Sequence, residues 1–345
     1  MTKTAIVLMN LGGPDSAAAV EPFLFNLFYD PAIIALPNPV RWLVARLIAR
    51  RRAPVARAIY AKIGNASPLL ANTHAQATAL ARELKGETRV FVAMRYWQPR
   101  AGEVAAAVKE WGAEQVVLLP LYPQFSSTTT ASSLQDWHGA AAEIGLTVPT
   151  RVICCYPTES GFIAALAGAM NNALDEWPPE LGAPRVLLSA HGLPKRIVAR
   201  GDPYETQVEQ TAAQLRLRIA KPNIESVVCY QSRVGPLDWL GPATDAEIRR
   251  AGKEGRGLIV VPVAFVSEHS ETLVELDIEY RHIAEMSGVP RYVRVPTVGA
   301  SPRFIAGLAA LVRDAQAADE MRVWPAEGVS HCDEAALLCC YRGAA

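Results

Sequence analysis

The stretch Val186-Leu187-Leu188-Ser189-Ala190-His191-Gly192-Leu193-Pro194 has the pattern of a buried strand that ends at a histidine. Its first five residues are apolar or small, which is typical of a strand covered on both faces, and the Gly and Pro after His191 predict a turn. In an open parallel sheet, ligands bind beyond the carboxyl ends of the strands. His191 is therefore a candidate functional residue, although a single histidine at such a place more often has only a structural partner.

Seven other short runs of β-branched or aliphatic residues repeat this pattern, and each is followed by a turn signal and an alanine-rich segment. Together with Arg185–Ser189, these runs are Thr4–Met9, Arg89–Ala93, Gln115–Leu119, Val152–Cys155, Ser226–Cys229, Leu258–Val263 and Tyr292–Val295. Apolar strands that alternate with amphipathic helices indicate parallel sheets covered by helices on both faces. The predicted fold class is α/β, with two Rossmann-like doubly wound domains, each built on a parallel β-sheet.

The domain organisation follows from the length of the chain. A chain of 345 residues is too long for the usual single core, so two domains are expected. The Tyr156-Pro157 step after the fourth strand candidate suits a crossover near residue 150. We predict an N-terminal α/β domain over residues 1–150, a C-terminal α/β domain over 151–318 and an extension over 319–345.

The composition excludes several classes of protein. Half of the residues are hydrophobic, and Lys and Arg together number 34, the same as Asp and Glu. This balance indicates neither a disordered chain nor a nucleic-acid-binding protein. The N-terminal apolar run ends at Met9, which is too short for a signal peptide or a membrane span. A cytoplasmic location is expected.

The first predicted strand leads into Asn10-Leu11-Gly12-Gly13-Pro14, which resembles the start of a dinucleotide-binding turn. The full fingerprint needs a third glycine that opens a helix, and Pro14 and Asp15 stand there instead. A tight turn that brings the backbone close to a flat ligand explains the two glycines equally well. This turn therefore gives little support to a nucleotide-dependent oxidoreductase.

The segment from Leu24 to Ala56 is first apolar and then basic, and it ends near Arg50-Arg51-Arg52. One interpretation is an ordinary amphipathic surface helix. The other is an apolar lip that contacts a membrane or an apolar substrate, with the arginines pairing with anionic groups. The sequence leaves both open.

A second functional candidate follows the predicted strand that ends near Phe265. Ser267 is a good N-cap residue, and the segment after it has four glutamates at steps of three, four and four: Glu268, Glu271, Glu275 and Glu279. In an α-helix, these steps place all four carboxylates on one face, where like charges repel by about 0.2–0.5 kcal/mol per pair. The pattern fits either a solvated acidic face or a row of oxygen ligands for a divalent cation.

Nine motifs occur in order along the chain. They are Asn10–Pro14, Tyr60–Pro68, Arg95-Tyr96, Tyr122–Ser126, Ser189–Pro194, Arg200–Tyr204, Tyr230–Pro236, Trp239–Pro242 and Ser267–Tyr280. In this combination, the sequence resembles the ferrochelatase family over about residues 4–315. The resemblance implies a chelatase-like fold with a porphyrin cleft between the two domains. It also implies an enzyme that inserts Fe²⁺ into protoporphyrin IX and releases two protons, the terminal step of haem biosynthesis.

The resemblance also implies roles for individual residues. His191 and Glu271 are the expected catalytic pair, in which a histidine beside a carboxylate accepts pyrrole protons. The expected metal contacts are His191, Glu268, Glu271, Glu275 and Glu279, and His269 and Asp277 belong to the same motif. The expected porphyrin contacts are Leu11, Arg52, Tyr60, Ser67, Tyr96, Gln231, Trp239 and Phe265. The side from which iron enters stays open.

The C-terminal extension groups three cysteines, Cys332, Cys339 and Cys340. It resembles the tail of those ferrochelatases in which C-terminal cysteines and one internal cysteine hold a 2Fe-2S cluster, and such a cluster needs four thiolates. The resemblance does not fix the internal ligand. Cys155 is the expected fourth ligand and Cys154 is the alternative, because Cys229 lies in a predicted core strand.

Several alternatives remain. The substrate of the chelatase could be coproporphyrin III or another tetrapyrrole, or the protein could be a porphyrin or haem carrier without catalytic activity. A carrier would need an axial ligand but not an acidic row beside its histidine. The expected partners are a porphyrin and ferrous iron, with peripheral contact to the inner face of a membrane and no nucleic acid. The chain is expected to be a monomer or a homodimer.

Overall fold

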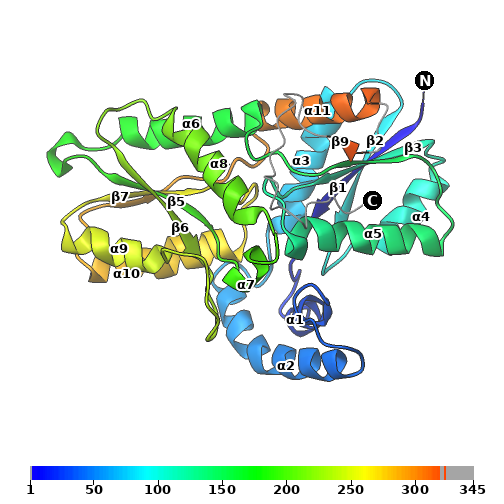
Figure 1. Ribbon diagram of the computed structural model, residues 1–345, viewed down its shortest axis with the longest axis horizontal. Coiled ribbons are helices and arrows are strands. Elements are labelled where there is room, and N and C mark those ends of the chain that lie inside the picture. The colour runs from blue at the N-terminus through cyan, green and yellow to red at the C-terminus, as the bar shows by residue number, and fades with distance from the viewer. Residues whose placement is uncertain (1, 319–321, 324–345) are drawn as a thin grey trace. The chain divides into compact units, whose positions relative to one another are not determined.

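The computed structural model describes residues 2–318 and 322–323. These residues form two compact units, and each unit has its own sheet and helices (Figure 1). The first unit contains the described residues up to Cys155 and those from Leu308 onward, and the second contains Tyr156–Gly307.

The first unit is built on a five-stranded parallel sheet with the strand order β2-β1-β3-β4-β9. All seven residues of its central strand β1 are buried, because helices cover both faces of the sheet. The elements of this unit before Cys155 are β1 (Thr4–Asn10), α1 (Val20–Tyr29), α2 (Val40–Ala61), α3 (Leu69–Glu83), β2 (Thr88–Met94), α4 (Ala101–Glu110), β3 (Gln115–Pro120), the π-helix η1 (Ser127–Ala131), α5 (Ser132–Glu143) and β4 (Thr150–Ile153). The short strand β9 (Arg322–Val323) pairs with β4.

The second unit repeats this topology on a four-stranded parallel sheet with the order β6-β5-β7-β8. Its elements are α6 (Ser160–Asp175), the 3₁₀ helix η2 (Pro179–Leu181), β5 (Arg185–His191), α7 (Lys195–Val198), α8 (Tyr204–Arg216), β6 (Glu225–Gln231), α9 (Thr244–Lys253), β7 (Leu258–Pro262), the π-helix η3 (Glu271–Tyr280), α10 (Arg281–Met286) and β8 (Tyr292–Arg294). The last helix, α11 (Pro302–Ala317), begins in this unit and ends in the first. Figure 1 shows α6 and α8 on one face of the sheet and α9 and α10 on the other.

In each sheet the first strand of the unit is central, and the chain proceeds from it toward both edges. β1 lies between β2 and β3, and β5 lies between β6 and β7. The chain direction across the sheet reverses beside these strands, and such a switch point is where ligands bind in doubly wound folds. His191 is the last residue of β5 and therefore lies at the switch point of the second unit.

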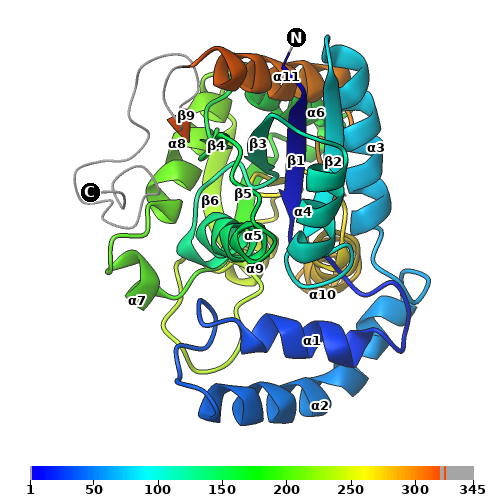
Figure 2. The same ribbon diagram turned by 90° about the vertical axis from the view of Figure 1, so that its right-hand side faces the viewer.

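Helices α1 and α2, which follow β1 in the sequence, pack against each other and form a separate layer of the first unit (Figure 2). Ala45, Ala49 and Ala53 are buried along one side of α2, whereas Leu43 and Leu47 are 63% and 51% exposed on the other. The pair is thus held together through small residues at helical spacing, and it presents apolar side chains to solvent.

The predicted α/β class with two doubly wound parallel sheets is confirmed. All eight predicted strands exist, with ends that differ by three residues or fewer. β9 was not predicted, because its two residues follow no apolar run. No helix of the described residues is long and apolar enough to cross a membrane.

Candidate active site

The second unit positions His191 through a tight connection between β5 and β6. His191 pairs with Gln231 in the parallel register, and the Gly192 amide donates to the Gln231 carbonyl at 2.8 Å. A Cβ atom at Gly192 would lie only 2.7 Å from that carbonyl oxygen, so the close approach requires glycine. The Tyr204 hydroxyl donates to the His191 carbonyl at 3.1 Å and fixes the backbone from the other side.

The His191 side chain contacts a carboxylate from the segment that follows β7. Its Nδ1 atom lies 2.7 Å from Oε2 of Glu271, the first residue of η3. The same oxygen lies 3.7 Å from Nε2 of His269. Glu271 therefore lies between two imidazole rings, while the His191 side chain stays 42% exposed.

The charges of this group shift the pKa values of its members. Burial opposes ionisation of Glu271, but the attraction of His191 and the hydrogen bonds from His191 and His269 are stronger and hold the pKa of the carboxyl well below its usual range. Burial likewise opposes the charge of His191, and the Glu271 carboxylate, with a further contribution from Glu275, raises the His191 pKa. Because Glu271 is ionised, Nδ1 of His191 donates to it, and Nε2 of the neutral ring keeps its lone pair.

Gln231 connects three parts of this site from a fully buried position. Its amide nitrogen donates to the Glu271 carbonyl at 3.0 Å and to Glu275 Oε2 at 3.1 Å. Its amide oxygen accepts from the Ser189 hydroxyl at 2.9 Å. Gln231 was an expected porphyrin contact. In the structure it is buried, and its side chain links β5 and η3 from its own position in β6.

Glu275 lies beside His191 and Glu271, and different hydrogen-bond donors hold its carboxylate. The Ser232 amide and the Tyr280 hydroxyl donate to its Oε1 atom at 2.8 Å and 2.9 Å. Burial and the neighbouring charge of Glu271 nevertheless raise the pKa of Glu275. Two adjacent carboxyls thus have opposite pKa shifts, which is a common arrangement where one group holds and another accepts a proton.

The other two glutamates of the acidic run are placed differently. Glu268 precedes η3, and its Oε1 atom accepts from Arg294 Nη1 at 2.6 Å and from the Thr297 amide at 2.9 Å. Arg294 also forms an ion pair with Asp277. Glu279 is exposed near the end of η3. The structure brings Glu271 and Glu275 together with His191, and it brings neither Glu268 nor Glu279 to that group.

The prediction of one α-helix with all four carboxylates on one face is therefore wrong. The segment Glu271–Tyr280 is a π-helix, and it begins after Glu268 at the cap residue Ser270 instead of at Ser267. The change of helix type does not separate the glutamates, because residues four apart lie close to one turn apart in an α-helix and in a π-helix. Glu268 is separated because it precedes the helix. Within residues 2–318 and 322–323, no group of three or more His, Cys, Asp and Glu side chains has the arrangement of a metal site.

Two aromatic residues complete the candidate residues of the second unit. Trp239 forms a β-bridge with Pro194, just after the His191 turn, and its indole Nε1 is buried without a hydrogen-bond partner in the part of the chain that the structure describes. The Phe265 ring packs against the His269 ring, with centroids 4.8 Å apart. Both aromatic residues thus lie beside the histidines of the site.

Four of the five expected porphyrin contacts of the first unit lie near α1 and α2. Leu11, Tyr60 and Tyr96 belong to one apolar cluster with residues of these helices. The Arg52 guanidinium lies 5.6 Å from the centre of the Phe28 ring. Ser67 packs against Gly13, where a Cβ atom would lie only 2.5 Å from the serine side chain. The predicted Gly12-Gly13 turn thus makes room for a side chain of the protein itself.

Asp30 is a buried residue of the first unit that the sequence did not indicate. Its Oδ2 atom accepts from Arg95 Nη2 at 2.9 Å, from the Tyr96 hydroxyl at 2.7 Å and from the Ser132 hydroxyl. Its other oxygen accepts from the Ala32 amide at 2.8 Å. The only sequence signal is the Arg95-Tyr96 motif, which contains two of these donors but does not reveal the acceptor.

The expected cysteine ligands are only partly described. Cys154 and Cys155 are buried directly after β4. Cys332, Cys339 and Cys340 lie outside the described residues.

The chain is similar to known proteins of one family. The sequence profile of the Ferrochelatase family matches residues 3–316. The chain belongs to the ferrochelatase family. Members of this family are enzymes that insert ferrous iron into a porphyrin in haem biosynthesis, so the iron and the porphyrin are substrates.

Individual ferrochelatases are similar over most of their length. The ferrochelatase of Caulobacter vibrioides (strain NA1000 / CB15N) is 52% identical over 320 residues, which cover 90% of each chain. The ferrochelatase of Hyphomonas neptunium is 52% identical over 313 residues, 89% of this chain and 86% of that protein. The ferrochelatase of Pelagibacter ubique is 44% identical over 315 residues, 90% of each chain.

Two solved structures share the fold of this chain. Sirohydrochlorin chelatase SirB of Bacillus subtilis subspecies spizizenii, in complex with cobalt, aligns with a TM-score of 0.54 at 12% identity and covers 91% of this chain and 96% of its own. SirB of Bacillus subtilis with Fe³⁺ aligns with a TM-score of 0.52 at 14% identity, covering 92% and 96%. At these identities, the likeness concerns the fold alone.

Proposed function

We propose that the chain inserts Fe²⁺ into protoporphyrin IX to form protohaem, with release of two protons. The observation that carries this proposal is the contact between His191 and Glu271 at the carboxyl end of β5. Metal insertion needs a base near neutral pKa for pyrrole protons, and a histidine held by an ionised carboxylate supplies one. His191 and Glu271 are the catalytic residues of the proposal.

In the proposed mechanism, Nε2 of His191 accepts a pyrrole proton. The charge that forms on the ring is stabilised by the Glu271 carboxylate, which lies 2.7 Å from Nδ1. Glu275 has a raised pKa and can hold a proton beside this pair. Glu279 is exposed, and we assign it to exchange with solvent. Glu268 is bound to Arg294, so its proposed role on the path of the iron is the weakest of the four.

The proposed porphyrin contacts come from both units. In the first unit, Leu11, Tyr60 and Tyr96 supply apolar surface, and Arg52 and Ser67 supply groups that can bind a carboxylate. In the second unit, Trp239 and Phe265 supply rings beside the histidines. The indole N–H of Trp239, which has no partner among the described residues, supplies a hydrogen-bond donor. Gln231 acts through Glu271 and Glu275 as a positioning residue.

The identity of the porphyrin is tested with the purified full chain under anaerobic conditions. Ferrous or zinc ion is mixed with protoporphyrin IX or with coproporphyrin III, and metalloporphyrin absorbance is followed. Faster turnover with protoporphyrin IX supports the proposal. Faster turnover with coproporphyrin III assigns the alternative substrate, and tight porphyrin binding without turnover would indicate a carrier.

We further propose a 2Fe-2S cluster held by Cys332, Cys339, Cys340 and either Cys155 or Cys154. Four thiolates are the usual ligand set, and five of the six cysteines remain when Cys229, buried in β6, is set aside. What supports the proposal is that β9 pairs with β4, the strand that directly precedes Cys154 and Cys155, and that Val323 of β9 lies opposite Ile153. These cysteines would serve only as ligands of the cluster, and the cluster takes no part in the proposed iron insertion.

Location and partners are proposals of the same kind. We propose a cytoplasmic protein, a monomer or homodimer, with domains at 1–150 and 151–318 and an extension at 319–345. The exposed Leu43 and Leu47, one helical turn apart, and the nearby exposed Trp42 and Arg50 suit peripheral contact with an anionic membrane surface. Vesicle sedimentation of the full chain would test this contact.

A further inference from the structure

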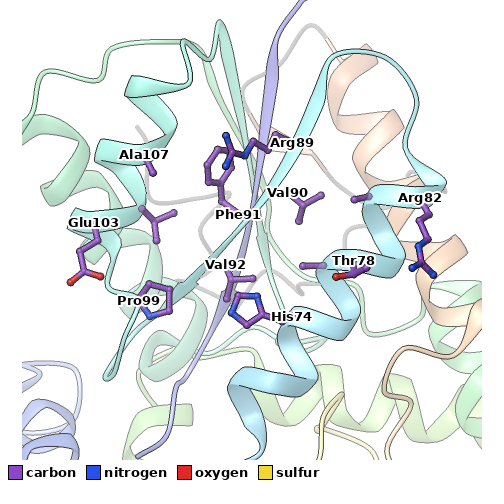
Figure 3. Close-up of a pocket in the computed structure, with 13 residues that line it drawn as sticks. His74, Thr78, Arg82, Arg89, Val90, Phe91, Val92, Pro99, Glu103 and Ala107 are labelled. Carbon is purple, nitrogen blue, oxygen red and sulfur yellow. The ribbon is translucent and has the colours of Figure 1, made fainter. Parts of the chain in front are cut away.

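The edge strand β2 borders an open groove in the first unit. Its inner side pairs with β1 from Thr88 to Met94 without interruption. On its outer side, between α3 and α4, there is a cavity of about 650 Å³ (Figure 3). Its floor is mostly apolar and is lined by Ala77 and Ala81 of α3, Val90 and Val92 of β2, and Val104 and Ala107 of α4.

The backbone of β2 is free along this groove. The Arg95 amide donates to Asn10 of β1, whereas the Met94 amide donates away from β1 to the Pro99 carbonyl at 2.7 Å. Because strand residues alternate, Val90 and Val92 also direct their N–H and C=O groups outward. Among the described residues, these four groups have no hydrogen-bond partner. Proteins usually protect such edges, and here Pro99 covers only the end near Met94.

The groove has positive side chains at one end and a negative side chain toward the other. Arg82 of α3 and Arg89 of β2 flank the end where β2 begins, and Glu103 of α4 lies toward the end near Pro99. In Figure 3, Val90 points toward Thr78 of α3, whereas Arg89 and Phe91 lie on the side of α4. A bound chain would therefore meet apolar side chains on both faces and two cations at one end.

We propose that this groove binds an extended segment of another protein, which adds a sixth strand beside β2. Main-chain groups spaced two residues apart match the outward groups of Val90 and Val92, and only a peptide backbone supplies both donors and acceptors at that spacing. Alternating apolar side chains fill the floor, and an acidic side chain pairs with Arg82 and Arg89. β9, the last described strand of this chain, lies at the opposite edge of the sheet, and the two arginines at the groove favour an acidic segment of a separate protein.

The test uses the full chain and hydrogen exchange resolved to single amides. The probe is a blocked pentapeptide, glutamate followed by alternating valine and threonine. In the free protein, the amides of Val90 and Val92 exchange fast, whereas those of Phe91 and Ala93, which face β1, exchange slowly. The probe slows exchange at Val90 and Val92 by about tenfold or more when it saturates the groove, and a peptide with lysine in place of glutamate binds more weakly.

Two kinds of variant separate the parts of the proposal. Charge reversal by Arg82→Glu and Arg89→Glu weakens probe binding about tenfold, whereas the matched change Arg313→Glu, at an exposed position of α11, does not. Val90→Pro removes one outward donor without removing a bond to β1, and it also weakens the probe. Porphyrin metalation is unchanged in the three arginine variants.

Three results would overturn the proposal. Slow exchange of Val90 and Val92 in the free protein at every concentration would mean that this chain covers its own edge. Protection that rises with protein concentration would identify a second copy as the occupant. Fast exchange of both amides at millimolar probe would mean that the groove binds no strand.

Discussion

Nδ1 of His191 and Oε2 of Glu271 are 2.7 Å apart, although 80 residues separate them in the sequence. The histidine ends β5 and the glutamate begins η3, so the contact depends on two adjacent strand ends of one sheet. Because the carboxylate is ionised and faces Nδ1, the geometry leaves Nε2 as the basic nitrogen.

Replacement of Glu271 by glutamine should abolish most of the turnover. The amide keeps the size of the side chain but removes the charge that stabilises protonated His191, so we expect porphyrin metalation to fall about 100-fold or more. The measurement is the rate of metalloporphyrin formation at saturating zinc. Glu285→Gln on the exposed face of α10 is the control and should match the unmodified protein. Unchanged turnover in Glu271→Gln would remove Glu271 from the catalytic pair.

The pH dependence of turnover follows from the same contact. The pKa of His191 is raised, and a base must be unprotonated to accept a proton, so kcat/KM should rise with pH through that raised pKa. Removal of the neighbouring charge in Glu271→Gln lowers the pKa of His191, and the midpoint of the residual activity should move to lower pH. A midpoint that stays in place or moves to higher pH would contradict this assignment.

Gln231→Leu should destabilise the second unit. The leucine cannot bond to Ser189, Glu271 or Glu275, and it leaves these buried groups with fewer partners. We expect the free energy of unfolding in urea to fall by about 1–3 kcal/mol. Gln98→Leu at an exposed position is the matched control and should change it little. Equal midpoints for the two variants would show that Gln231 does not hold the site together.

The strands could be predicted from the sequence, because buried parallel strands are continuous apolar runs. The pair His191–Glu271 was expected only from the resemblance to the ferrochelatase family, and a strand end alone indicated no more than His191 as a candidate. The sequence was not sufficient for the acidic run. The steps between the glutamates are equally compatible with an α-helix, and nothing local indicates a π-helix. Glu268 binds Arg294 of β8, which lies 26 residues further along the chain. The sequence does not reveal this contact, so it could not show that Glu268 lies apart from Glu271 and Glu275.

The proposed cluster gives a prediction that does not depend on activity. Anaerobically purified protein should be brown and contain about two iron and two sulfide per chain. Cys332→Ser should lose this absorbance, whereas Cys229→Ser, in a buried strand of the second unit, should keep it. Cys155→Ser and Cys154→Ser, compared with each other, identify the fourth ligand. A colourless protein without iron or sulfide would exclude the cluster.

Asp30→Asn should weaken the first unit more than the loss of any single partner. The amide nitrogen would face three donors, from Arg95, Tyr96 and Ser132, and Arg95 would lose its nearest buried counter-charge. We expect a loss of about 3 kcal/mol in the free energy of unfolding, because a buried charge would lose its partner.

Two further variants divide this effect into its parts. Tyr96→Phe removes one donor and should cost about 1 kcal/mol. Asp136→Asn should cost less than Asp30→Asn, because Asp136 is 23% exposed and lies 3.4 Å from Arg95. If the Tyr96 hydroxyl acts only through Asp30, the double variant Asp30→Asn with Tyr96→Phe will be no less stable than Asp30→Asn alone. An additional loss in the double variant would instead show that the Tyr96 hydroxyl stabilises the first unit independently of Asp30.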